Sequence, residues 1–172
     1  MIDPSCDPKG EPYMAYMKRR WGGDGWVTGL KESGAPDGVL FGDWKTWPHT
    51  FLAHRLLTHT LDKYGCNKQH LLKEILFQRL YERGENISDP EILLKAATEA
   101  KVEEGAKEAI NGPESDALGK KTAAEDYVAK SDLGISSVPT FVLPGNVRMS
   151  GAQPTSVFKK IIDALANGES LV

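Results

Sequence analysis

The sequence predicts a helix-dominated α/β fold in which a short β-hairpin near the C-terminus accompanies a long run of helices. Three observations lead to this prediction. Apolar residues recur every three or four positions through most of residues 48–110. Residues 140–143 and 147–150 are two short strand-like runs, and the Pro144-Gly145-Asn146 turn between them suits a hairpin. Helical spacing returns after Pro154, and 172 residues are enough for one domain with a real core.

The first 45 residues are rich in Gly, Pro and Asp. One short helix is expected over residues 11–21, with Pro12 near its first turn. The following Gly22-Gly23-Asp24-Gly25 is interpreted as a turn and not as a phosphate loop, because no strand precedes it and no Lys-Ser/Thr pair follows. The nearby large aromatic residues are expected mainly in the core, with a binding groove as the alternative: Trp26, Phe41, Trp44 and Trp47.

The helical middle can be divided by its start and stop signals. A helix over residues 48–64 should stop at Gly65, and Asn67 is the expected cap of the next. Ser88-Asp89-Pro90-Glu91 matches a capping box, with Ser88 as the N-cap and Glu91 reaching back. Two further helices are expected, over residues 103–110 and 115–133.

The strand at 140–143 is preceded by a proline, Pro139, which cannot donate a ladder hydrogen bond. A proline at the start of an apolar strand is a good candidate for a cis peptide bond, because the X-Pro amide loses most of its preference for trans. We therefore expect the Val138–Pro139 bond to be cis.

Two runs near the C-terminus carry a family resemblance: Gly134-Ile135-Ser136-Ser137-Val138-Pro139-Thr140-Phe141-Val142, and Ser150-Gly151-Ala152-Gln153-Pro154 with its closing helix. They resemble the DsbA-like thioredoxin family, in its FrnE-like branch. Trp47-Pro48-His49-Thr50 and Ala53-His54-Arg55-Leu56 resemble the helical insertion of that family, and Ile2-Asp3-Pro4 looks like the end of its second strand.

The resemblance implies an incomplete thioredoxin-like fold with a large all-helical insertion. It divides the chain into an N-terminal remnant at 1–46, the insertion at 47–112 and a C-terminal thioredoxin-like part at 113–172. The family's Cys-x-x-Cys begins a helix that has no counterpart in this sequence. The only cysteines are Cys6 and Cys66, and neither matches the motif position. Because disulfide exchange needs an attacking thiolate and a resolving thiol, both are expected to be ordinary unpaired cysteines, and the catalytic residues are unknown.

Three functions remain open. The first is a DsbA/FrnE-like thiol–disulfide oxidoreductase, truncated or redox-inactive as written, with Val138, Pro139 and Thr140 binding a thiol-containing protein or small molecule. The second is a relative of the glutathione-dependent kappa-type transferases and isomerases, which use a serine in place of the cysteine. The third is a non-enzymatic interaction module.

Composition excludes several classes of partner. A net charge of −3 argues against nucleic acid and anionic membranes, and no apolar run is long enough to span a bilayer. The histidines at 49, 54 and 59 are spaced by five and do not share a helix face, so no metal site is expected. No cofactor is expected, apart from glutathione under the second function. With no signal peptide visible, the expected location is cytoplasmic.

Without the family's first strand, the strand at 140–143 should have an apolar open edge. Such an edge invites pairing with another chain, so self-association is expected. The alternative is that residues 1–40 fold back and supply an unrecognised strand.

Overall fold

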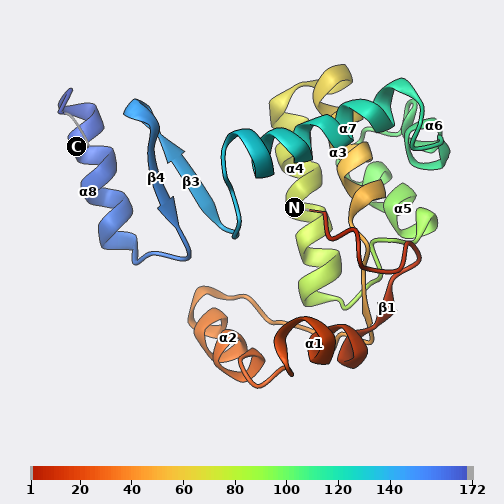
Figure 1. The fold of residues 1–172 in the computed structure, drawn as a ribbon, viewed down its shortest axis with the longest axis horizontal. Coiled ribbons are helices and arrows are strands. Elements are labelled where there is room, and N and C mark those ends of the chain that lie inside the picture. Colours follow the sequence, from red (N-terminus) through yellow and green to blue (C-terminus); the bar gives the residue numbers. More distant parts are fainter. Residues whose placement is uncertain (1, 170–172) are drawn as a thin grey trace. The chain divides into compact units, whose positions relative to one another are not determined.

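The computed structural model describes residues 2–169. They form two compact units, residues 2–125 and residues 126–169 (Figure 1). The helical predominance and the C-terminal hairpin agree with the α/β class expected from the sequence. The boundaries proposed at 46/47 and 112/113 stay a prediction.

The first unit begins with an extended segment, a short helix and a small ribbon. The ribbon pairs β1 (Glu11–Pro12) with β2 (Thr46–Trp47) in antiparallel register. Helix α1 (Tyr13–Trp21) follows β1 directly and ends at Gly22, which adopts the left-handed conformation that glycine tolerates best. The helix thus starts two residues later than expected. Residues 2–4 form no strand, so the resemblance of Ile2-Asp3-Pro4 to a strand end was misleading.

Sequence periodicity missed the second helix. Helix α2 (Val27–Gly34) continues into the 3₁₀ turn η1 (Ala35–Asp37). The helix buries only Val27, and its sequence contains two glycines. It therefore lacks the apolar stripe by which an amphipathic helix is predicted from sequence.

The helical middle is a bundle of packed helices with one continuous core. Helix α3 (Phe51–Tyr64) stops at Gly65, as expected, and α4 (Cys66–Phe77) begins at the next residue, so Asn67 is not its cap. Helix α4 runs on through a single π turn, η2 (Gln78–Glu82). Helices α5 (Pro90–Ala100) and α6 (Ala106–Asn111) complete the bundle. Its most deeply buried side chains include Leu56, Leu72, Leu93, Ala96, Ala100, Val102 and Ala106.

A second, aromatic core lies between α1, β2 and the end of η2. Tyr13 contacts both Trp44 and Trp47, with ring centroids 5.6 and 6.1 Å away. The indole nitrogen of Trp44 donates to the carbonyl of Tyr81 at 3.1 Å, which ties this core to the bundle. The aromatic residues therefore serve mainly as core; Trp26, which is 46% exposed, is the exception.

The capping residue of α5 differs from the prediction. Asp89 is the N-cap, and its carboxylate accepts a hydrogen bond from the Glu91 N–H at 2.9 Å. Ser88 is buried, and its hydroxyl accepts from the His49 N–H at 2.7 Å and donates to the His49 carbonyl at 3.1 Å. The predicted capping role of Ser88 was wrong because a contact with a residue 39 positions away occupies its hydroxyl.

Replacing each of these two residues should separate the two roles. Asp89→Ala should lower the free energy of unfolding by about 1 kcal/mol, the usual cost of losing an N-cap. Ser88→Ala should cost about 2 kcal/mol, because it leaves a backbone N–H and a carbonyl of His49 without partners. Urea titrations measure both, with exposed Ser33→Ala as the control. A larger loss for Asp89→Ala than for Ser88→Ala would restore the capping box as the dominant feature.

Helix α7 (Ala117–Tyr127) leads from the first unit into the second and ends in a π turn, η3 (Val128–Asp132). The second unit then forms the predicted hairpin. Strand β3 (Thr140–Leu143) pairs with β4 (Val147–Ser150) across the turn η4 (Pro144–Asn146). Helix α8 (Thr155–Ala166) follows. Phe158 of α8 meets Phe141 of β3 edge to face, with centroids 4.9 Å apart.

Two further features bear on the expected partners. Among the described residues, no helix is long and apolar enough to cross a membrane. No cluster of three or more possible metal ligands occurs among them either.

Candidate functional site

The loop before β3 is held by its own hydrogen bonds. The Thr140 hydroxyl donates to the Ser137 carbonyl at 2.7 Å, and the Pro139 carbonyl accepts from the Gly151 N–H at 2.8 Å. The peptide bond between Val138 and Pro139 is cis. These contacts fix the segment Val138-Pro139-Thr140 at the start of the hairpin, and 68% of Val138 is exposed.

The register of the hairpin determines which backbone groups β3 leaves free. Thr140 lies opposite Ser150 and Phe141 opposite Met149. In an antiparallel pair, hydrogen-bonded and non-hydrogen-bonded positions alternate. Because Pro139 is bonded to Gly151, the next bonded positions are Phe141 and Leu143. The N–H and C=O groups of Thr140 and Val142 therefore point away from β4.

That outer edge has no strand beside it in the described part of the chain. The only strand paired with β3 there is β4, and the other two-residue strands pair with each other. Neither β1 nor any other part of residues 2–40 supplies the strand considered as an alternative from the sequence. The edge thus keeps two donors and two acceptors directly after Pro139.

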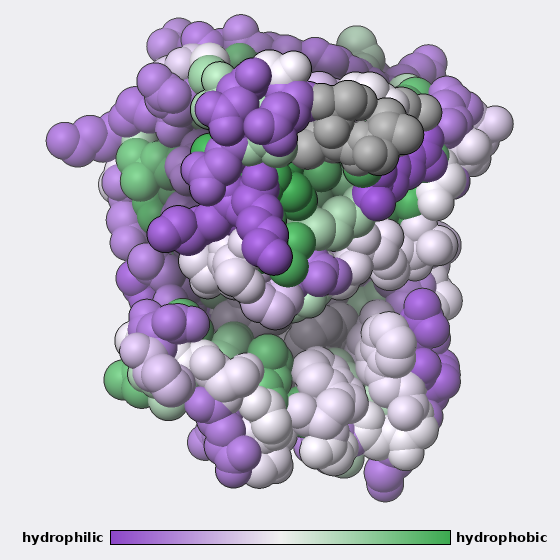
Figure 2. All heavy atoms as spheres, turned by 90° about the vertical axis from the view of Figure 1, so that its left-hand side faces the viewer, coloured by the Kyte–Doolittle hydropathy of each residue, from purple (hydrophilic) through white to green (hydrophobic). Residues whose placement is uncertain are grey.

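The two faces of β3 differ. Phe141 points to α8, where it packs on Phe158. Val142 points to the opposite face and is 49% exposed. Exposed apolar residues also occur on α8, at Ile162 and Leu165. Figure 2, viewed from the side where Figure 1 draws α8, shows apolar groups at the surface among hydrophilic ones.

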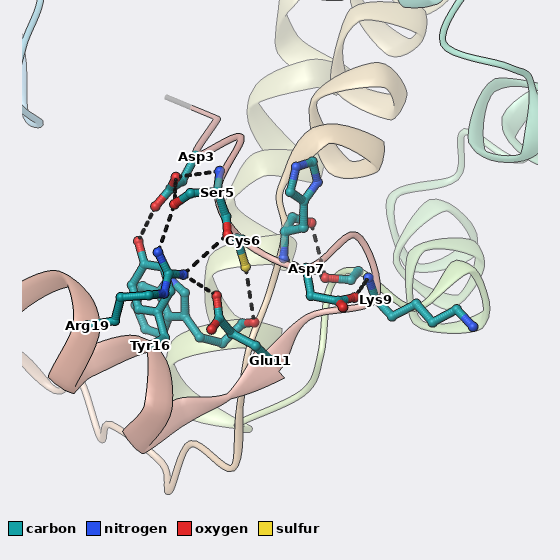
Figure 3. Close-up of polar contacts among 11 residues, drawn as sticks. Asp3, Ser5, Cys6, Asp7, Lys9, Glu11, Tyr16 and Arg19 are labelled. Carbon is teal, nitrogen blue, oxygen red and sulfur yellow. Dashed lines mark hydrogen bonds and ion pairs between the residues drawn. The ribbon is translucent and has the colours of Figure 1, made fainter.

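The first cysteine lies in a polar network at the N-terminal segment, shown in Figure 3. The Asp3 carboxylate accepts from the Tyr16 hydroxyl at 3.0 Å and from the Ser5 hydroxyl at 2.7 Å, and Arg19 bridges Ser5 and Glu11. Cys6 is only 4% exposed, and its thiol lies 3.8 Å from the carbonyl oxygen of Trp47. The network fastens the chain start to α1.

This setting suppresses the reactivity of Cys6. Burial, with the neighbouring carboxylates of Glu11 and Asp3, raises the pKa of its thiol from 9.0 to about 12. Because the thiolate is the nucleophile in disulfide exchange, Cys6 has the opposite of a catalytic environment.

The second cysteine is exposed and stands alone. Cys66 is the first residue of α4, and its thiol lies 3.8 Å from the side-chain oxygen of Asn67. Both cysteines are free, so the structure brings together no thiol pair among the described residues.

Alkylation should distinguish the two thiols. Near neutral pH, iodoacetamide should label Cys66 in the folded chain and leave Cys6 unlabelled until urea is added, as followed by peptide mass spectrometry. Since the pKa of Cys6 is higher in the folded chain than in the unfolded one, this thiol should not change the free energy of unfolding below pH 9.0 and should lower it as pH rises towards about 12. Equal labelling of both thiols in the folded chain would contradict the buried position of Cys6.

Sequence reasoning selected Val138, Pro139 and Thr140 but missed Val142 as the second edge residue. The signal was available, since counting in twos from Thr140 gives Val142 the same orientation. The network of Asp3, Tyr16 and Arg19 around Cys6 carried no sequence signal, because its members come together only through the packing of α1.

Comparisons with known proteins agree with this architecture. A family model described as "DSBA-like thioredoxin domain" matches residues 28–163. The uncharacterized protein YwbO of Bacillus subtilis (strain 168) is 28% identical over 162 residues, which cover 92% of this chain and 74% of that protein. The family match spans both the helical bundle and the hairpin, including the Val138-Pro139-Thr140 loop. The chain belongs to the DsbA-like thioredoxin family, a family of the thiol–disulfide oxidoreductase type.

Proposed function

We propose that the chain takes part in thiol–disulfide exchange by holding an extended, thiol-bearing segment at Val138-Pro139-Thr140, and that its own two cysteines are not the reacting thiols. One observation carries the proposal: the N–H and C=O groups of Thr140 and Val142 are left free by β4, directly after Pro139. An extended peptide binds such an edge as an added strand, with the main chain supplying affinity.

The chemistry of exchange supports the second half of the proposal. A thiolate attacks one sulfur of a disulfide, the other sulfur leaves as a thiolate, and a further thiol resolves the mixed disulfide. Cys6 is buried and protonated, and Cys66 has no cysteine beside it. The part that this chain plays is therefore to position the segment, while the thiol pair comes from elsewhere.

An activity assay tests the role of the cysteines. The 172-residue chain should reduce insulin no faster than dithiothreitol alone, and Cys66→Ser and Cys6→Ser should leave that background unchanged. Turnover well above background that is lost in either variant would overturn the proposal and identify the nucleophile.

A binding experiment tests the loop. A short extended peptide with one reduced cysteine, added to dilute protein, should shift the amide resonances of Thr140 and Val142. The amides of Arg148 and Ser150, on the outer edge of β4, are the internal control for unspecific edge pairing. Shifts caused by glutathione and not by the peptide would favour the kappa-type function instead, and shifts confined to β4 would overturn the proposed site.

A further inference from the structure

The open edge of β3 is complementary to itself. Thr140 and Val142 each offer one outward N–H and one outward C=O, two residues apart on one strand. If two copies meet edge to edge in antiparallel order around Phe141, Thr140 of each copy lies opposite Val142 of the other. Both positions are then hydrogen-bonded pairs, so all four outward donors find acceptors.

The side chains fit this arrangement. Thr140 of one copy lies beside Val142 of the other on the face away from α8, and pairs of β-branched residues stabilise neighbouring strands. The two Phe141 residues meet at the symmetry axis as a non-hydrogen-bonded pair, where side chains approach most closely. The contact would cover Val142, which is 49% exposed.

Charge distinguishes this edge from the other edge of the hairpin. Strand β3 has no charged residue, whereas Arg148 occupies an outward position of β4. A charged residue is a common device against edge pairing, and two antiparallel β4 edges would place two arginines near each other. The prolines at 139 and 144 bracket β3, which limits pairing to the four strand residues.

The charges of the C-terminal unit do not oppose the contact either. Within residues 126–169 the cationic and anionic side chains are equal in number: Lys130, Arg148, Lys159 and Lys160 against Asp126, Asp132, Asp163 and Glu169. The net charge of −3 comes from the rest of the chain, so the residues of this unit add no net repulsion of their own to the contact.

We propose that a second copy of this chain pairs with the β3 edge, giving a two-fold symmetric dimer in which the two hairpins form one four-stranded antiparallel sheet. Because only four backbone hydrogen bonds join the two copies, the dimer is weak and reversible. It uses the groups assigned above to the extended substrate, so the cysteine-bearing peptide should dissociate it.

Amide exchange in the wild-type chain gives the sharpest test. Over roughly a hundredfold rise in protein concentration, the amides of Thr140 and Val142 should become slower to exchange while the molecular mass by light scattering doubles. The amides of Phe141 and Leu143, bonded to β4, should be protected at every concentration and serve as the internal control. A chain that stays monomeric overturns the proposal, as does a dimer in which Thr140 and Val142 still exchange fast.

A variant pair complements this test. Val142→Pro removes an outward N–H that β4 does not use, so the hairpin should persist while the dimer is lost. Val142→Thr keeps the N–H and a β-branched side chain and should dimerise like the wild type. Dimerisation of a folded Val142→Pro chain would overturn the proposed edge. Peptide binding to dilute monomer is measured independently, so failure of the dimer and failure of the substrate site are distinguishable.

Discussion

Arg55→Ala should lower the free energy of unfolding by about 3 kcal/mol, one of the two largest losses expected from a single substitution in this chain. The Arg55 side chain is fully buried on α3. Its Nε donates to the Ala109 carbonyl at 2.8 Å, and one terminal nitrogen donates to the Pro113 carbonyl at 3.0 Å. The guanidinium also holds the Asp116 carboxylate through two bonds of 3.0 and 2.9 Å.

These bonds connect α3 with the end of α6 and the start of α7. Two glycines make room for the guanidinium: a Cβ at Gly112 would lie 2.5 Å from one terminal nitrogen, and a Cβ at Gly119 would lie 2.6 Å from the other. Removing Arg55 takes a donor from two carbonyls and a carboxylate. The Pro113 carbonyl keeps the Asp116 N–H and the Asp116 carboxylate keeps the Gly119 N–H, while the Ala109 carbonyl loses its side-chain donor. The loss should fall near the lower end of the range for broken buried pairs, because the Asp116 side chain is 34% exposed and can regain water.

The same variant should change the acid sensitivity of the chain. The hydrogen bonds from Arg55, with a backbone bond from Gly119, lower the pKa of Asp116 from 3.8 to about 2. A carboxyl with a lower pKa in the folded state stabilises the fold above its unfolded value and loses that contribution as pH falls towards about 2. Part of the acid destabilisation between these two values should therefore disappear in Arg55→Ala.

Urea titrations at several pH values measure both effects. Arg55→Lys keeps the charge but not the planar fork, so it should lie between wild type and Arg55→Ala. Arg83→Ala is the matched control, because Arg83 is 43% exposed and its ion pair with Glu99 is 3.4 Å long. A loss from Arg55→Ala no larger than that from Arg83→Ala would show that the buried network contributes little.

Local chemistry made the C-terminal hairpin predictable to the residue. Pro139 and the Pro144-Gly145-Asn146 turn bracket β3 and fix the register. The bounds predicted for both strands therefore equal those in the structure. Gly65 ended α3 for the same kind of reason, since a glycine beyond a periodic run is a local stop signal. The open edge of β3 followed from the family resemblance, because the strand expected beside it has no counterpart in the sequence.

Contacts between distant residues could not be predicted in the same way. Ser88 and Asp89 are both good capping residues, and only the position of His49 decides which one caps α5. The partner of Arg55 lies 61 positions along the chain, and no periodicity indicates it. The free backbone groups of Thr140 and Val142 lie between these two cases. Alternation along the strand from Pro139 identifies them, but only once the pairing of β3 with β4 is known.

Gly84→Ala should lower the free energy of unfolding by about 3 kcal/mol, for a reason that again involves distant segments. Gly84 has a φ of +67°, which costs an alanine about 1–2 kcal/mol. A Cβ there would also lie 2.4 Å from the carbonyl oxygen of Asp43. Backbone cannot move aside as a flexible side chain can, so the clash should add about 1–3 kcal/mol.

The clash should also be visible in the aromatic core. The Gly42 N–H donates to the Tyr81 carbonyl at 2.8 Å, and the indole of Trp44 donates to the same oxygen. Pushing residues 42–44 away from Gly84 should weaken both bonds and shift tryptophan fluorescence to the red. Gly22→Ala is the matched control, because Gly22 has a similar φ of +74° and a Cβ added there would meet no atom within 4 Å. It should cost only the backbone strain, so equal losses from the two variants would show that the close approach to Asp43 does not contribute.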